Sequence, residues 1–451
     1  MCFGRQPATC HDAEVFGGRR GIVARLALTL TSAALGLSCY ASHSIEERAD
    51  AGEDGGPGPS LPDLGGRDAG TPDAEVPLPP EPVPDPGPDG RPSDDEGADD
   101  WEDPPTLDPG DPCCLSLGEP QEIRHGRDTW GHLTVEWNGD GWGVLWSSRF
   151  SGFQPLDRDG SPVGPIRWLG VGALGGNLHW SGGRYGTLIA SAGDDPQDKV
   201  FALLDARGVR ATPWTDLWAH LPSIHARLAR VEHMNRWLVV EGYDSPLNVV
   251  ELDGEGVIVD HRELEPVVVA AGVKVVALKS RAVVFSRLPE HAAAHVLTVP
   301  LAESTIDPVI LSEDDVGGGG AAARLRDAAV WLTNRDATGR GDLFVFDPFE
   351  GAAEHHTIDR LGRMRAMAGV DRYDLLAVCT RGDDLDEPDG LALTLFDRSG
   401  QQVGRSVGLT SGERTFDQCA IGVDGDRLFV AWNDYHRQRL LVQGFRILSG
   451  S

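Results

Sequence analysis

The sequence has few positive charges and almost no lysine. Lys and Arg together number 40 against 70 Asp and Glu among the 451 residues, which gives a net charge of −30. Lysine occurs only at Lys199, Lys274 and Lys279. Nucleic-acid binding draws its affinity from Lys and Arg side chains that neutralise phosphates. The charge therefore argues against a nucleic-acid partner.

The motifs of common enzyme classes are also missing. The sequence has no Gly-x-Ser-x-Gly elbow, phosphate-binding loop, dinucleotide fingerprint or His-Glu-x-x-His pattern. His291 and His295 fall in a loop and a strand, so they lack the helical spacing that would place both on one face. The acidic segment 383–390 misses the Asp-x-Asp-x-Asp-Gly spacing of a calcium loop. We expect no metal site and no cofactor.

Near its N-terminus the sequence has an apolar run of 12 residues, Leu26 to Leu37. A membrane-spanning helix needs about 20 apolar residues, so this run is too short to be one. Arg19, Arg20 and Arg25 precede it, which is the order of a signal peptide over residues 1–38. The arginine pair also fits a twin-arginine signal, and a translation start after Met1 fits the sequence as well.

The end of this run, Leu35-Gly36-Leu37-Ser38-Cys39, resembles the lipobox of bacterial lipoproteins, although Gly36 stands where that family usually has Leu. The resemblance implies that Cys39 is the acylated first residue of an exported chain. The chain would then be anchored by lipid in the cell envelope, at the outer membrane or cell surface. Ordinary signal-peptide cleavage is the alternative and would leave a periplasmic or secreted protein.

An acidic segment rich in Pro and Gly follows. Residues 46–112 hold 21 Asp and Glu, 3 Arg, 16 Pro and 11 Gly in 67 positions. Like charges repel and nearly no aromatic side chains are available for burial, so such a segment cannot form a core. Residues 39–112 are therefore predicted to be a lipidated N-terminus followed by a disordered linker.

Residues 113–451 contain a repeat. Alternating apolar strands recur with their last residues 44 to 53 positions apart, about 48 on average. Several third strands end in Asp followed three or four positions later by Gly, as in Asp157 to Gly160, which predicts a tight hairpin into a fourth strand. The strands that define the register are 142–146, 185–190, 237–241, 282–286, 329–333, 375–379 and 428–432.

Four-stranded units of this length resemble the blades of β-propellers, although the Gly-His and Trp-Asp pairs of WD40 blades are missing. The sequence therefore predicts an all-β propeller of seven four-stranded blades. Eight blades or a pair of β-sandwiches also fit the spacing. The last unit has only three strands, and residues 115–125 form an unassigned extended stretch before the first unit. We expect this N-terminal strand to complete the last blade and close the ring.

Four cysteines remain in this domain: Cys113, Cys114, Cys379 and Cys419. An exported protein meets conditions that permit disulfides. The ends of the strands that carry Cys379 and Cys419 are expected at the same face of adjacent blades, which favours a bridge between them. The adjacent pair Cys113 and Cys114 could instead bridge the ring or form a vicinal disulfide, because four cysteines allow three pairings.

The function predicted from this layout is non-catalytic binding of an unknown protein or glycan by a monomer that meets the membrane only through its lipid anchor. Binding residues are expected in the loops after the second strands, because function concentrates in loops on rigid scaffolds. The candidates are Phe150, Tyr243, Arg335, Arg381, Asp434, Tyr435 and His436. The alternative is a glycan-cleaving hydrolase or lyase with carboxylates at the channel mouth. A structural role in an envelope assembly is a third possibility.

Overall fold

The computed structural model describes residues 107–448, apart from position 109 and fifteen further short gaps. The predicted signal peptide, Cys39 and nearly all of the linker lie outside the described residues. Within the described part of the chain, no helix has the length and apolar composition needed to cross a bilayer. The further gaps are 127–131, 148–149, 172–174, 191–198, 222–224, 243–244, 270–271, 289–290, 302–307, 314–318, 335–338, 360, 382–389, 411–417 and 435–436.

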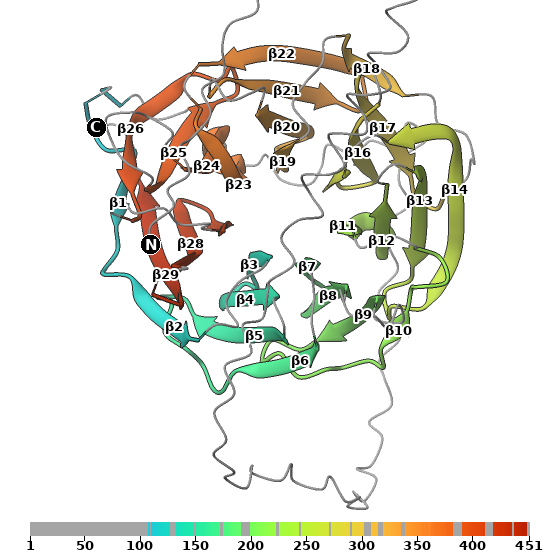
Figure 1. Cartoon of the computed structure of the whole chain (residues 1–451), viewed down its shortest axis with the longest axis horizontal. Coiled ribbons are helices and arrows are strands. Elements are labelled where there is room, and N and C mark those ends of the chain that lie inside the picture. The colour runs from blue at the N-terminus through green and yellow to red at the C-terminus, as the bar shows by residue number, and fades with distance from the viewer. Residues whose placement is uncertain are drawn as a thin grey trace, which may run out of the picture. The chain divides into compact units, whose positions relative to one another are not determined.

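The described residues form seven antiparallel sheets arranged as a ring (Figure 1). Each sheet is a blade whose first strand lies innermost and whose later strands follow outward. This arrangement is a seven-bladed β-propeller, so the predicted fold class and blade number are confirmed.

The first three blades follow one another along the chain without crossovers. Blade 1 consists of β3 (Leu133–Trp137), β4 (Gly141–Ser147), β5 (Phe150–Asp157) and β6 (Arg167–Val171). Blade 2 consists of β7 (Gly175–Ser181), β8 (Arg184–Ala190), β9 (Lys199–Leu204) and β10 (Thr215–Asp216). Blade 3 consists of β11 (Arg227–Val231), β12 (Arg236–Glu241), β13 (Ser245–Leu252) and β14 (Ile258–Val269), with the short 3-10 helix η2 (Glu232–Met234) between its first two strands.

The next three blades repeat the same order. Blade 4 consists of β15 (Lys274–Ala277), β16 (Arg281–Arg287), β17 (Ala292–Thr298) and β18 (Val309–Ser312). Blade 5 consists of β19 (Gly319–Leu325), β20 (Ala328–Asn334), β21 (Gly341–Asp347) and β22 (Ala352–Ile358). Blade 6 consists of β23 (Arg363–Val370), β24 (Leu375–Arg381), β25 (Leu391–Asp397) and β26 (Gln402–Gly408), with η3 (Asp371–Tyr373) between its first two strands.

Blade 7 is completed from the other end of the described chain. Its own strands are β27 (Cys419–Asp424), β28 (Arg427–Asp434) and β29 (Arg439–Ile447). Two N-terminal strands, β1 (Cys114–Ser116) and β2 (Gln121–His125), both pair with the outer edge of β29. The predicted closure of the ring by an N-terminal strand is therefore confirmed, with two short strands in place of one.

The second strand of each blade is the most apolar because it is covered on every side. All seven residues of β4 are buried, since β3 and β5 flank it within the sheet and neighbouring blades cover both of its faces. The ring of Trp142 stacks on Phe429 of blade 7 with the ring centroids 4.9 Å apart. The core therefore lies between blades, and burial of about 25 cal/mol per Å² of apolar surface stabilises the ring as a whole.

The predicted Asp/Gly turns form between the third and fourth strands. The Oδ1 atom of Asp157 accepts hydrogen bonds from the N–H groups of Asp159 and Ser161, at 3.0 and 2.8 Å. Gly160 has a φ of +92°, a conformation that favours glycine, and a Cβ atom there would collide with the ring of Phe429. The turn glycine thus both closes the hairpin and lets blade 1 approach blade 7.

Candidate functional site

A channel with a volume of about 840 Å³ runs along the ring axis. The innermost strands of the seven blades line it. Because every blade repeats the same strand order around the ring, these strands all begin at one end of the channel. We call the end where they begin the upper mouth and the opposite end the lower mouth. A volume of this size matches the sites that hold small molecules.

Charges are divided unequally along the channel. His132, Arg227 and Lys274 stand at or just before the first residues of inner strands, so they lie in the upper half. Among the described lining residues, the carboxylates are Glu136, Glu232 and Asp371, which stand at or beyond the last turns of inner strands and so lie in the lower half. The described upper half is therefore basic, although the whole chain is strongly acidic.

Burial and mutual repulsion act together on the basic groups of the upper mouth. Burial, with Arg227 nearby, lowers the pKa of Lys274 to about 7. Burial also lowers the pKa of His132 to about 4, and the charges of Arg227, Lys274 and His225 lower it further. The pKa of His225 falls for the same reasons, burial first and then the charge of Arg227. We call these four residues the basic cluster. At neutral pH its histidines are uncharged.

The lower half contains an unusual carboxyl group. Burial raises the pKa of Glu136 to about 8, and the nearby charge of Glu232 adds to this rise. Its Oε1 atom accepts a hydrogen bond of 3.3 Å from the backbone N–H of Trp180 and lies 3.9 Å from Nδ1 of His179. Nε2 of His179 lies 2.9 Å from the carbonyl oxygen of Leu228. A carbonyl oxygen only accepts, so Nε2 carries the proton and Nδ1 keeps its lone pair.

Three of the seven predicted binding residues are among the described ones. Phe150 begins β5, is 37% exposed, and meets the ring of Trp168 edge-on with the centroids 6.4 Å apart. Arg381 ends β24. Asp434 ends β28 and pairs with Arg439 at 3.3 Å. These three residues belong to blades 1, 6 and 7, on the face of the upper mouth but outside the channel lining. The other four, Tyr243, Arg335, Tyr435 and His436, lie outside the described residues.

The basic cluster and Glu136 were not predicted from the sequence. The apolar second strands define the repeat in the sequence, whereas these residues belong to the first strands and the segments just before them. The scarcity of lysine was a usable signal, because two of the three lysines, Lys274 and Lys279, line the channel. Among the described residues, no three His, Cys, Asp or Glu side chains are grouped so that they could hold a metal ion.

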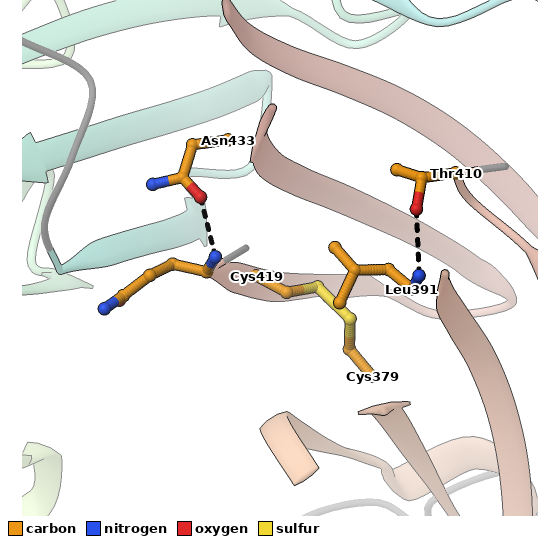
Figure 2. Close-up of a disulfide and its surroundings, with 6 residues drawn as sticks. Cys379, Leu391, Thr410, Cys419 and Asn433 are labelled. Atoms are coloured by element: carbon orange, nitrogen blue, oxygen red, sulfur yellow. Dashed lines mark hydrogen bonds between the residues drawn. A yellow bond between two sulfur atoms is a disulfide. The ribbon is translucent and has the colours of Figure 1, made fainter. Parts of the chain in front are cut away.

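The predicted bridge between Cys379 and Cys419 is present and joins β24 of blade 6 to β27 of blade 7 (Figure 2). Hydrogen bonds flank it on both sides: the N–H of Gln418 donates to Oδ1 of Asn433 at 2.6 Å, and the N–H of Leu391 donates to Oγ1 of Thr410 at 2.9 Å. The disulfide thus links the two blades near the upper mouth, while each hydrogen bond lies on the side of one blade.

Cys113 and Cys114 carry free, buried thiols in this structure, so neither forms the ring-bridging or vicinal disulfide considered as alternatives. Their sulfur atoms lie 3.0 Å apart, and a hydrogen bond between them lowers the pKa of Cys113 and raises that of Cys114. Both pack in the apolar cluster that also contains Cys379 and Cys419. They therefore mark the point where the closing strands join blades 6 and 7.

The fold and the channel together define a β-propeller protein. No family model and no curated protein sequence matches the chain. Its solved structural neighbours are β-propellers. The β-propeller domain of the Trilobed protease from Pyrococcus furiosus aligns at 10% identity and a TM-score of 0.45, covering 70% of this chain and 95% of that one.

Two further structures show the same degree of likeness. The β-propeller domain of Cps50 (Swd1) from Myceliophteria thermophila aligns at 14% identity and a TM-score of 0.47, covering 73% of this chain and 99% of that one. The WD40 domain of coronin from Toxoplasma gondii aligns at 10% identity and a TM-score of 0.48, covering 77% of this chain and 89% of that one. At these identities the likeness concerns the fold alone.

Proposed function

We propose that the protein is a cell-envelope lipoprotein whose propeller binds a protein or glycan partner through the face of the upper mouth. The observation that carries this proposal is the channel itself: a rigid seven-bladed ring encloses about 840 Å³ and gathers basic side chains at one mouth. Concave sites with a few convergent polar groups on a rigid scaffold are typical of ligand binding. Propellers commonly serve as protein-binding scaffolds, which supports the same function.

The point where the N-terminal segment joins the ring supports the upper mouth as the binding face. Cys114 pairs with Ile447 at the end of β29, and the N–H of Ile447 donates to the carbonyl oxygen of Asp426 in the turn between β27 and β28. That turn belongs to the face of the lower mouth. A tether that joins the ring there leaves the upper mouth free of the attachment, which suits a binding face.

The lipid anchor is tested by the intact mass of the protein purified from membranes. We expect a chain that begins at Cys39 and carries acyl chains, and that gains about 2 Da on reduction of one disulfide. An unlipidated mass, or a different first residue, would remove the anchor from the proposal. The binding function of the ring is tested separately.

The binding face is tested with substitutions at its rim. The full chain is applied to glycan arrays and is also cross-linked in envelope preparations, and the partner is identified by mass spectrometry. We expect Phe150→Ala and Arg381→Ala to weaken binding of that partner, while Val257→Ala, next to a lower-face turn and 58% exposed, leaves it unchanged. Equal binding by all three variants would place the partner elsewhere on the ring.

Glu136 supports a second candidate, a glycan-cleaving hydrolase. A general acid must hold its proton at neutral pH, and burial gives Glu136 a pKa of about 8. The charge of Glu232 also raises the pKa of Glu136, so two carboxyl groups of the channel lining interact with each other. Release of reducing ends from polysaccharides by the wild type, abolished in Glu136→Gln but retained in Glu350→Gln at an outer turn, would favour the hydrolase over the binding module.

A further inference from the structure

The basic cluster collects charge from parts of the chain that are far apart in sequence. His132 precedes β3 of blade 1, Arg227 is the first residue of β11 in blade 3, and Lys274 is the first residue of β15 in blade 4. All three line the same mouth of the channel, and His225 stands two residues before Arg227. This is unusual in a chain with 70 acidic residues and three lysines.

Placing these groups together costs free energy. Each of them is only partly exposed, and burial is the first cause of every pKa decrease within the cluster. No carboxylate is found among the described lining residues of the upper half, so the nearest channel carboxylates belong to the lower half. Buried charges in proteins are ordinarily paired. A group that brings a negative charge into the upper mouth would offset this cost.

We infer that the upper mouth binds a carboxylate-bearing ligand, held by Arg227 and Lys274 with His132 as a neutral hydrogen-bonding neighbour. This inference rests on the proposed binding function and specifies the chemistry of its ligand. Arg supplies a planar fork that matches a carboxylate, and Lys adds a point charge that holds the second oxygen. The ligand carboxylate supplies a negative charge beside Arg227 and Lys274, whose charges meet no carboxylate among the described lining residues of the upper half.

The charge of the cluster fits a carboxylate better than a phosphate dianion. At neutral pH both histidines are neutral and Lys274 is partly protonated, which leaves between one and two positive charges. One negative charge balances that number, whereas two exceed it. The channel volume of about 840 Å³ accommodates a sugar acid or an acidic side chain together with its ordered water.

The carboxylate has two possible sources. A free ligand, such as an acidic sugar of the envelope, supplies one group per residue. The acidic linker of this chain, residues 46–112, supplies 21 Asp and Glu from the same molecule. Both sources use the same chemistry, so the experiment includes one arm for each.

The first arm measures binding of D-glucuronate to the full chain at pH 7 by calorimetry, with glucose and inorganic phosphate as comparisons. We expect glucuronate to bind and glucose not to bind, and phosphate to bind more weakly than glucuronate. Lys274→Met and Arg227→Met should each weaken glucuronate binding by about tenfold. Lys279→Met is the matched control, because it removes a lysine from the lower half of the same channel and should leave the affinity unchanged.

The second arm uses a full-length variant in which the Asp and Glu of residues 46–112 are replaced by Asn and Gln. Tighter glucuronate binding in this variant would identify the linker as a competing occupant, and unchanged binding would identify a free ligand as the source. Lys274→Met should also raise the midpoint of thermal unfolding in the absence of anion, because it relieves the repulsion within the cluster. This readout shows that the variant is folded.

The inference is overturned if glucuronate does not bind, if phosphate binds more tightly, or if Lys279→Met weakens binding as much as Lys274→Met. Such a result leaves the proposed binding face standing when Phe150→Ala and Arg381→Ala still lose the partner. Conversely, glucuronate binding without any captured partner would support the carboxylate site and count against a macromolecular ligand on the rim.

Discussion

A buried histidine in blade 4 makes the stability of the ring depend on pH. His295 lies in β17 and is fully buried, and its Nε2 atom is 2.7 Å from Oγ of Ser286, which is also buried. Burial lowers the pKa of His295 to about 4 from the ordinary 6.5. The pair resembles a nucleophile with its base, but both side chains are buried and neither lines the channel.

The sign of the effect follows from proton linkage. The folded pKa lies below the unfolded one, so between pH 6.5 and 4 the unfolded chain binds more protons at this site. The contribution of His295 is therefore complete above pH 6.5 and is lost as the pH falls toward 4. From these two pKa values the loss is about 2 kcal/mol at pH 5 and about 3 kcal/mol at pH 4.

The assay compares the free energy of unfolding in urea at pH 7.5 and pH 5.0 for the wild type and His295→Gln. Glutamine does not titrate, so this variant should lose about 2 kcal/mol less than the wild type between the two pH values. His132 shares the same pH window but is present in both proteins, so its contribution cancels. His125→Gln is the control, since its side chain is 67% exposed. Equal losses in the wild type and His295→Gln would refute the reasoning.

Three further predictions concern contacts between neighbouring blades. Replacing both Cys379 and Cys419 by Ala should lower the free energy of unfolding by about 4 kcal/mol, because the bridge closes a loop of 40 residues; urea titration of the oxidised protein measures this. Glu241→Gln should cost about 3 kcal/mol, because it leaves the buried ammonium of Lys199, 3.8 Å away, without its counter-charge; the double variant Lys199→Met/Glu241→Gln should recover most of the loss in the same assay. Gly186→Ala should cost about 2 kcal/mol in thermal unfolding, because its Cβ would collide with a tryptophan ring of blade 3.

The architecture was predictable because all seven blades of the propeller share the same pattern of strand burial. Every blade needs a second strand that is apolar on both faces, and this strand stands out from its surroundings in sequence. The stretch predicted at 142–146 is β4 (Gly141–Ser147), and the turn from Asp157 to Gly160 forms as expected. The missing fourth strand of the last unit indicated the closure, because an open sheet edge would otherwise remain exposed.

The site was not predictable by the same means. Residues of the channel wall come from seven strands, and the charged residues among them are spread over several strands without a spacing that a sequence motif could carry. His132 and Lys274 are 142 positions apart and meet only because blades 1 and 4 face a common axis. Rim residues such as Phe150 were accessible to prediction because the loops after second strands could be placed from the repeat alone.

The charges at both ends of the channel are compatible with binding of one anionic ligand. A carboxylate held at the upper mouth would be repelled by an ionised carboxylate deeper in the channel, but Glu136 keeps its proton below a pH of about 8. The burial that raises this pKa thus removes the repulsion that would oppose anion binding. As the pH rises through 8, Glu136 ionises while Lys274 has already lost most of its charge, because its pKa is about 7. Both changes weaken anion binding in the same direction, so glucuronate affinity should fall steeply between pH 6.5 and 9. In Glu136→Gln the fall should follow Lys274 alone and be complete about one pH unit earlier.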